Sequence, residues 1–340
     1  MSETPRSLGL RMPAEWERHE ATWISWPKDP DTFPPAILPK VESAYVKIVE
    51  ALGAAEEVRI LVDDSKSERR VSSLLKKGEL ATFHRIKTVD VWTRDYLPTF
   101  VKGRELAAVR WVFNAWGNRY EDLLPDNEAG EEVAEYTGLK IFHPGIVLEG
   151  GAVDSDGERT ILTTENVILN SNRNPGLGKR RSEAIFADYL SGERTIWLKK
   201  GIEGDDTDGH VDDIARFVGP RTVVAAAERR QADPNHTVLK ENRAILEKSR
   251  DAGGRSLEVV DIPMPKRLES SEGRLPASHL NFYIGNRAVL VPTFGGESDG
   301  KALRSLESAF PTREVIGIDC RALAHGLGTI HCVTQQVPAT

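Results

Sequence analysis

The chain has 340 residues, with 45 Lys and Arg against 52 Asp and Glu, which gives a formal net charge of −7. Hydrophobic residues make up 39% and charged residues 29%, a balance typical of globular proteins. At this length the chain can bury a sizeable core, as one large domain or two ordinary ones. The negative charge argues against nucleic acid as a partner and is compatible with a cationic substrate, although an ordinary acidic surface is the simpler explanation of the total.

Two features of the sequence bear on the compartment. Residues 1–20 lack the apolar core of a signal peptide, and no apolar run approaches the roughly 20 residues of a membrane span. The two cysteines, Cys320 and Cys332, are too few for a disulfide scaffold, although a single bond between them stays open as an alternative. We therefore expect a protein of the reducing cytoplasm with no membrane partner.

The first predicted elements lie in the N-terminal part of the chain. Residues 12–27 contain three tryptophans, Trp16, Trp23 and Trp26, a density that fits either core packing or the wall of a substrate cleft. Apolar residues at three-and-four spacing over 37–52 predict a helix that ends at Gly53. A short buried strand is predicted to follow at 58–62.

The same helix-then-strand order recurs along the chain. It is predicted at 128–138 with 140–142, 179–190 with 195–198, 236–250 with 256–262, and 300–310 with 314–318. Hairpins are predicted at Asp156-Gly157 and Gly285-Asn286. Polar motifs follow four of the five strands. Such motifs come together near a common axis if the units are arranged around it like the blades of a β-propeller. We therefore predict one closed domain over residues 1–340, with residues 1–10 a candidate flexible N-terminus.

The most informative motif spans residues 204–217 and has the sequence GDDTDGHVDDIARF. If the residues after Gly209 form a strand, His210 and Asp212 lie on one face, while Val211 and Asp213 lie on the other. A histidine beside a carboxylate is suited to proton transfer near neutral pH, and the carboxylate can also hold a cationic substrate.

A candidate nucleophile, Cys332, lies in GLGTIHCVTQQ at residues 326–336. A buried thiol is more often an inert small hydrophobe than a nucleophile, but the glycine-flanked polar segment and the candidate base His210 favour a catalytic role. The neighbouring His331 is predicted to point to the opposite face if the segment is extended, so we interpret it as structural.

Two further carboxylates are candidates for the same site. Asp95, in VWTRDYLPTF, forms either a local ion pair with Arg94 on a solvated loop or, together with Trp92, a ring-and-carboxylate surface that suits a planar cation. Glu149 precedes a glycine pair and is either solvated at a strand end or pressed against another group.

A metal site is the alternative interpretation of the histidine motif. His210 and Asp212 could ligate one ion together with His325 or Asp206. The sequence, however, contains neither HExxH nor CxxC, and the 204–217 motif lacks the carboxylate pattern of a calcium loop. We therefore predict no metal and no other cofactor.

Seven motifs between residues 12 and 338 resemble the agmatine deiminase and bacterial (Porphyromonas-type) peptidylarginine deiminase family. They are MPAEWERHEATWISWP, VWTRDYLPTF, VLEGGAVD, TTENVILNSNRNP, GDDTDGHVDDIARFV, LNFYIGN and TIHCVTQQVP. The family belongs to the guanidino-group-modifying enzymes, so the resemblance implies a pentein-like five-bladed α/β propeller of ββαβ units. This expectation agrees with the five units found above.

The resemblance also implies roles for individual residues. It makes Cys332 the nucleophile, His210 the acid and base, and Glu149 the acidic residue that supports the histidine. The carboxylates expected to hold the guanidinium are Asp95 and Asp212. The residues expected beside the substrate are Trp92 and, towards its far end, Asp206.

The implied reaction is hydrolytic deimination of agmatine to N-carbamoylputrescine and ammonia in polyamine biosynthesis, through a covalent amidino-cysteine. The alternatives are a deiminase of peptidyl or free arginine and, in another class, a non-catalytic guanidine or polyamine binder. The expected partner is the small cationic substrate, and a homo-oligomer is compatible with the sequence. Three departures from the family pattern, at Asp206, Tyr96-Leu97 and Thr329, leave the expected catalytic residues unchanged.

Overall fold

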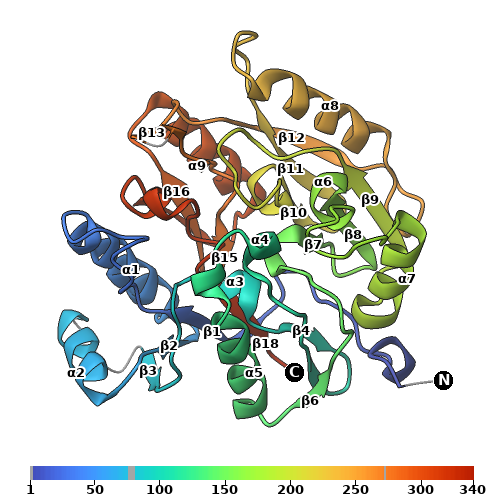
Figure 1. Ribbon diagram of the computed structural model, residues 1–340. Coiled ribbons are helices and arrows are strands. Elements are labelled where there is room, and N and C mark those ends of the chain that lie inside the picture. Colours follow the sequence, from blue (N-terminus) through green and yellow to red (C-terminus); the bar gives the residue numbers. More distant parts are fainter. Residues whose placement is uncertain (1–2, 76–80, 272) are drawn as a thin grey trace.

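The computed structural model describes residues 3–75, 81–271 and 273–340 as a mixed α/β fold (Figure 1). Its strands form separate sheets, and none of the sheets in these described segments is closed on itself. No helix in the same segments is long and apolar enough to cross a membrane.

Four of the sheets share one pattern. A hairpin of two antiparallel strands is followed by a helix, and the chain then returns as a third strand parallel to the second. Such a parallel return requires a crossover, which the helix supplies. The sheets are β4 (Thr99–Lys102), β5 (Leu106–Val109) and β6 (Lys140–Phe142); β7 (Val153–Ser155), β8 (Thr160–Thr164) and β9 (Arg194–Leu198); β10 (Ala215–Gly219), β11 (Thr222–Ala227) and β12 (Glu258–Pro263); and β15 (Tyr283–Ile284), β16 (Ala288–Thr293) and β17 (Glu314–Asp319).

The fifth sheet joins strands from opposite ends of the sequence. Its order is β18 (Gln335–Pro338), β1 (His19–Ser25), β2 (Glu57–Leu61) and β3 (Ala81–His84). Strand β18 pairs antiparallel with β1, so that Trp23 lies opposite Gln335. This pairing holds the segment that follows Cys332 against the start of the chain.

The predicted helix-then-strand units are confirmed. The helices that precede the last strand of each predicted unit are α1 (Leu38–Leu52), α5 (Asp126–Tyr136), α7 (Lys179–Leu190), α8 (Asn235–Lys248) and α9 (Glu297–Ala309). In Figure 1 they lie on the outside, while the short α3 (Thr93–Tyr96) and α4 (Ala115–Asn118) lie near the middle. Both predicted hairpins are also present, as β7–β8 and β15–β16.

Further elements complete the described chain without altering this plan. They are helices α2 (Ser65–Leu74) and α6 (Glu165–Ile168), the two-stranded sheet of β13 (Glu269–Ser270) and β14 (Gly273–Arg274), and 3₁₀ turns at Arg6–Leu8, Glu121–Leu123, Gly150–Ala152, Val211–Asp213 and Leu323–Gly326. Near the N-terminus, Leu10 is buried, and its carbonyl accepts a hydrogen bond from Ser191.

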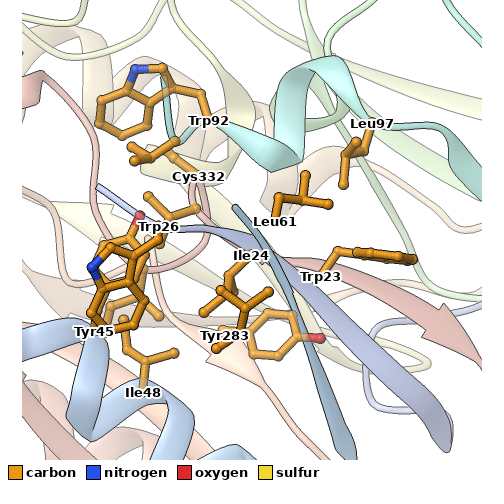
Figure 2. Close-up of a cluster of buried hydrophobic side chains, with 14 of the residues drawn as sticks. Trp23, Ile24, Trp26, Tyr45, Ile48, Leu61, Trp92, Leu97, Tyr283 and Cys332 are labelled. Atoms are coloured by element: carbon orange, nitrogen blue, oxygen red, sulfur yellow. The ribbon is translucent and has the colours of Figure 1, made fainter. Parts of the chain in front are cut away.

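Two of the three tryptophans near the N-terminus belong to the core, whereas Trp16 is only partly buried. Trp23 and Trp26 are buried among apolar side chains that include Tyr45 and Ile48 of α1 (Figure 2). Burial of such large side chains stabilises the fold by about 1.5–3 kcal/mol each relative to exposure. The same cluster extends to Trp92 and Cys332, so the core supports the candidate site directly.

Candidate functional site

A cavity of about 190 Å³ contains the predicted nucleophile. Its lining is strongly acidic, and none of the described residues that line it is lysine or arginine. The lining includes Cys332, Trp92, Trp116, Tyr120, His325 and six carboxylates from Asp29, Asp31, Asp90, Asp95, Asp122 and Asp206. Such a cavity favours a cationic ligand.

The nucleophile lies in a turn rather than in an extended segment. Residues 330–333 form the turn, and strand β18 begins only at Gln335. The Cys332 sulfur lies 3.9 Å from Oδ2 of Asp212 and accepts a hydrogen bond from Nδ2 of Asn281 at 3.1 Å. Burial and the carboxylates of Asp212, Asp213 and Asp95 raise the pKa of the Cys332 thiol well above its usual value. The thiol of the substrate-free protein is therefore held in its neutral form.

His210 lies between two carboxylates at the centre of the site. Its Nδ1 is 3.8 Å from Oδ1 of Asp95, and its Nε2 is 3.9 Å from Oε2 of Glu149. Burial lowers the pKa of His210, but Asp95, Glu149 and Asp212 outweigh this effect and raise it to about 10. The imidazole is therefore protonated at neutral pH.

The predicted strand after Gly209 is wrong. Val211–Asp213 form a 3₁₀ turn, and strand β10 begins at Ala215. His210 and Asp212 still reach one space, because a Cβ atom built on Gly151 would lie 2.6 Å from the His210 ring and 3.0 Å from the Asp212 carboxylate. The turn, not strand alternation, brings the two side chains together.

Gly151 lies against three of the predicted site residues. A Cβ at this position would meet His210 at 2.6 Å, and Asp212 and Asp95 at 3.0 Å each. Gly151→Ala should therefore displace these side chains and lower kcat/KM by about a hundredfold, because a misplacement of about 1 Å has that effect on reacting groups. The measurement is ammonia release from agmatine, the substrate that the sequence resemblance implies. The matched control is Gly178→Ala, where a Cβ would meet nothing within 4 Å, and equal activity of the two variants would contradict the prediction.

Glu149 is pressed against other groups and is not solvated. It is fully buried, and its Oε1 accepts a hydrogen bond from Nε of Arg173 at 2.7 Å. Burial raises the pKa of Glu149, but His210 and Arg173 outweigh burial, so the pKa is lowered. Glu149 is thus an ionised carboxylate placed behind His210.

Asp95 has no ion pair with its neighbour. Arg94 instead approaches Glu15 at 3.5 Å, so the hypothesis of a solvated local pair is wrong. Asp95 lies in α3, where Oδ1 accepts from the Gly151 amide at 3.0 Å and Oδ2 accepts from the Trp116 indole at 2.9 Å. Burial raises the pKa of the Asp95 carboxyl, and the attraction of His210 offsets only part of this rise, so the pKa stays above its usual value.

The expectation that His331 points away from the site is also wrong. Its Nδ1 lies 2.7 Å from Oδ2 of Asp212, and its Nε2 lies 2.8 Å from Oε2 of Glu15. Burial raises the pKa of Asp212, but the hydrogen bond from His331 and the electrostatic attraction of His331, His210 and Arg216 together outweigh it and keep the pKa low. The structural role predicted for His331 therefore takes a specific form, which is to hold Asp212 ionised and in place.

The two predicted substrate-side residues both line the cavity. The Trp92 indole donates to Asp90 at 2.8 Å, and its ring would lie 2.4 Å from a Cβ at Gly328, so the glycine permits this packing. Asp206 accepts a hydrogen bond from the Tyr120 hydroxyl at 2.6 Å, and burial raises the pKa of its carboxyl.

The sequence interpretation missed several residues of the site. Trp116 lies in a run of left-handed backbone with φ of 50°, 53°, 84° and 60° at residues 115–118, a conformation that the Gly-Asn pair could have suggested. Asn281 and Glu15 had no local signal, because their partners lie far away in the sequence.

Among the described residues, no group of three or more His, Cys, Asp or Glu side chains is arranged to hold a metal ion. The absence of a metal stays a prediction.

Comparisons with known proteins place this site in context. The family model described as Porphyromonas-type peptidyl-arginine deiminase matches residues 11–338. An agmatine deiminase of Stutzerimonas stutzeri is 36% identical over 369 residues, which cover 100% of this chain and 98% of the relative. The solved agmatine deiminase of Enterococcus faecalis has a TM-score of 0.92 at 32% identity, covering 99% of this chain and 98% of its own. A C. jejuni agmatine deiminase variant with substrate bound has a TM-score of 0.87 at 27% identity, covering 96% of both chains.

Proposed function

The chain belongs to the Porphyromonas-type peptidyl-arginine deiminase family, and on this premise we propose that it deiminates agmatine by hydrolysis, releasing N-carbamoylputrescine and ammonia. The observation that carries the proposal is a thiol in an acidic cavity that no described lysine or arginine lines, together with a protonated His210 next to Asp95, one of the lining carboxylates. A guanidinium stays protonated at working pH, so it needs such carboxylates when it leaves water.

The bound cation activates the nucleophile. Asp95 and Asp212 hold the guanidinium, and Trp92 lies beside it. In the free protein, burial and the neighbouring carboxylates raise the pKa of the Cys332 thiol, so its proton is retained. Neutralising those carboxylates with a guanidinium lowers the thiol pKa and favours the thiolate, and the thiol proton passes to solvent because His210 is already protonated.

The chemistry then proceeds in two steps. The Cys332 sulfur attacks the guanidinium carbon and forms a C–S bond, His210 gives its proton to the departing nitrogen, and ammonia leaves as the C–N bond breaks. Neutral His210 next removes a proton from water, and the water oxygen attacks the amidino carbon. The C–S bond then breaks, Cys332 leaves as a thiolate, and the second proton of the former water passes to solvent as the product carbonyl forms. Glu149 stabilises the protonated form of His210 before the first step and after the second.

The fold is proposed to be a pentein-like five-bladed propeller. Five sheets with three or four strands each, four of them built as hairpin, helix and parallel strand, support five ββαβ blades. The cavity lining comes from loops that follow strands of four of these sheets, namely the loops after β1, β3, β5, β9 and β17, as expected where blades meet around an axis. We assign residues 1–340 to one domain.

The proposed setting is polyamine biosynthesis in the cytoplasm. Both cysteines are free, and a catalytic thiol must stay reduced to act. The proposed partner is the guanidino substrate, with no nucleic acid or membrane involved, and an assembly of identical subunits is compatible with this function.

The purified protein should prefer agmatine to free arginine by at least about a hundredfold in kcat/KM, or roughly 2.7 kcal/mol. The two substrates differ by one carboxylate remote from the reaction, and the described cavity lining offers it no lysine or arginine. Ammonia release from agmatine, arginine and an arginyl peptide measures the preference. Comparable turnover of arginine or the peptide would favour the alternative deiminase, and binding without ammonia release would favour the non-catalytic binder.

Asp206→Asn should narrow this preference, mainly by raising KM for agmatine. Asp206 faces the cavity and is held by Tyr120, so it is the acidic group that we place near the far ammonium. Asp122→Asn is the matched control, because Asp122 is an exposed carboxylate of the same cavity and should contribute little. An unchanged KM in Asp206→Asn would place the ammonium elsewhere.

A further inference from the structure

We propose that Asn281, oriented by Thr329, stabilises the thiolate of Cys332 with a direct N–H···S hydrogen bond. Asn281 is fully buried in the segment before β15, and its Nδ2 donates to the sulfur at 3.1 Å. The catalytic benefit of this hydrogen bond rests on the proposed function. The hydrogen bond itself and its effect on alkylation of the thiol do not depend on that function.

Three donors fix the orientation of the Asn281 amide. Oδ1 accepts from the Thr329 hydroxyl at 2.8 Å, from the His331 amide at 3.0 Å and from the Cys332 amide at 3.3 Å. If the side chain were flipped, its NH₂ group would face these three donors, and an acceptor would face the sulfur. The oxygen therefore belongs on the turn, and the NH₂ group faces Cys332 and Asp213, to which Asn281 also hydrogen-bonds.

The sulfur needs such a donor because its other neighbours oppose a negative charge. The titratable groups that face it are Asp212 and Asp213 from the 3₁₀ turn and Asp95 from α3, and Tyr45 of α1 also interacts with it electrostatically. The backbone N–H of Thr329 is a second donor that lowers the thiol pKa. Asn281 and this backbone N–H together form a preorganised pair of hydrogen-bond donors for the thiolate.

These two donors stabilise the thiolate in both steps of the reaction. When the guanidinium binds, the donors lower the free energy of the thiolate that attacks it. When the C–S bond breaks, they stabilise the thiolate that leaves. Thr329 acts through Asn281 and is therefore a positioning residue. From the sequence alone, Thr329 was one of three departures from the family pattern that leave the expected catalytic residues unchanged.

Asn281→Asp separates a chemical role from a structural one. The aspartate keeps the acceptors that hold the turn, but it replaces the N–H donor with an oxygen. Below the thiol pKa, the alkylation rate at fixed pH is proportional to the thiolate fraction. We expect iodoacetamide to alkylate Cys332 of Asn281→Asp at least about tenfold more slowly, and kcat/KM to fall about tenfold to a hundredfold, the range for a hydrogen bond to a charged group.

Because the aspartate also adds charge, a second pair of variants tests the orientation. Thr329→Val replaces the hydroxyl with a methyl group and should slow alkylation about threefold to tenfold, whereas Thr329→Ser keeps the hydroxyl and should retain the rate of the unmodified protein. Ser278→Ala is the matched control, since Ser278 holds the same segment through the carbonyl of Asp213 and does not contact the sulfur. Mass spectrometry of peptides separates Cys332 from Cys320.

The outcomes are distinct. Slower alkylation in Asn281→Asp and Thr329→Val, with normal rates in Thr329→Ser and Ser278→Ala, supports the proposal. Lower activity with unchanged alkylation in both variants overturns it, because Asn281 then only holds the turn. If the alkylation pattern is as expected but the unmodified protein releases no ammonia from agmatine, the proposed function fails while this inference stands.

Discussion

Cys332→Ala abolishes deimination, with an expected loss of about 10⁵-fold to 10⁶-fold in kcat, as is typical when a covalent nucleophile is removed. In the described part of the chain, the only other cysteine is Cys320, which is fully buried and outside the cavity lining. Burial also raises the pKa of Cys320 far above its usual value, so it cannot substitute. Ammonia release from agmatine, measured at high enzyme concentration, gives the residual rate.

Two controls separate the lost nucleophile from a damaged fold. Cys320→Ala removes a sulfur from the core and should retain turnover, although it costs some stability. Agmatine should still bind to Cys332→Ala, as measured by calorimetry, because Asp95 and the remaining acidic lining of the cavity are intact. More than a few per cent of activity in Cys332→Ala would contradict covalent catalysis.

His210→Gln should lower kcat by about 10²-fold to 10⁴-fold, the usual contribution of a general acid and base. Glutamine cannot protonate the departing nitrogen, and it cannot activate water for the second step. We expect the amidino group to accumulate on Cys332, where mass spectrometry of peptides should find it. An adduct on Cys320, or normal turnover, would rule out the assigned roles.

The charge of His210 makes a stability control necessary. Its imidazolium lies among Asp95, Glu149 and Asp212, so a neutral glutamine leaves these buried carboxylates less compensated. Tm is therefore measured for each variant. His325→Gln is the matched control for chemistry, because His325 also lines the cavity but is exposed, and it should keep full activity.

The repeating units could be predicted because their helices are amphipathic. In α1, for example, Val41, Tyr45, Ile48 and Leu52 fall on one buried face at three-and-four spacing. Helix α2 was missed because it is mostly polar and buries Val71 alone. It begins at a local N-cap, where Asp64 accepts hydrogen bonds from two backbone amides, a signal that is weak without an apolar stripe.

The site was predictable in its reactive residues but not in its supporting contacts. Cys332 and His210 lie in motifs of unusual composition, so the sequence alone singled them out. The turn that carries His210 depends on hydrogen bonds from its amide to Asp205 and Thr207, which compete with the strand expected from alternation. The contact of His331 with Glu15 joins residues 316 positions apart, and no local pattern predicts it.

The pairing of β18 with β1 also has a consequence for folding kinetics. Each of the other three- or four-stranded sheets can collapse from neighbouring parts of the sequence, whereas this sheet must close a loop of almost the whole described chain. Loops of such length form slowly, because their entropy cost precedes any stabilising contact. The turn that carries the sulfur lies next to β18, so it becomes ordered only after this late closure. During refolding, secondary structure therefore recovers before catalytic competence does.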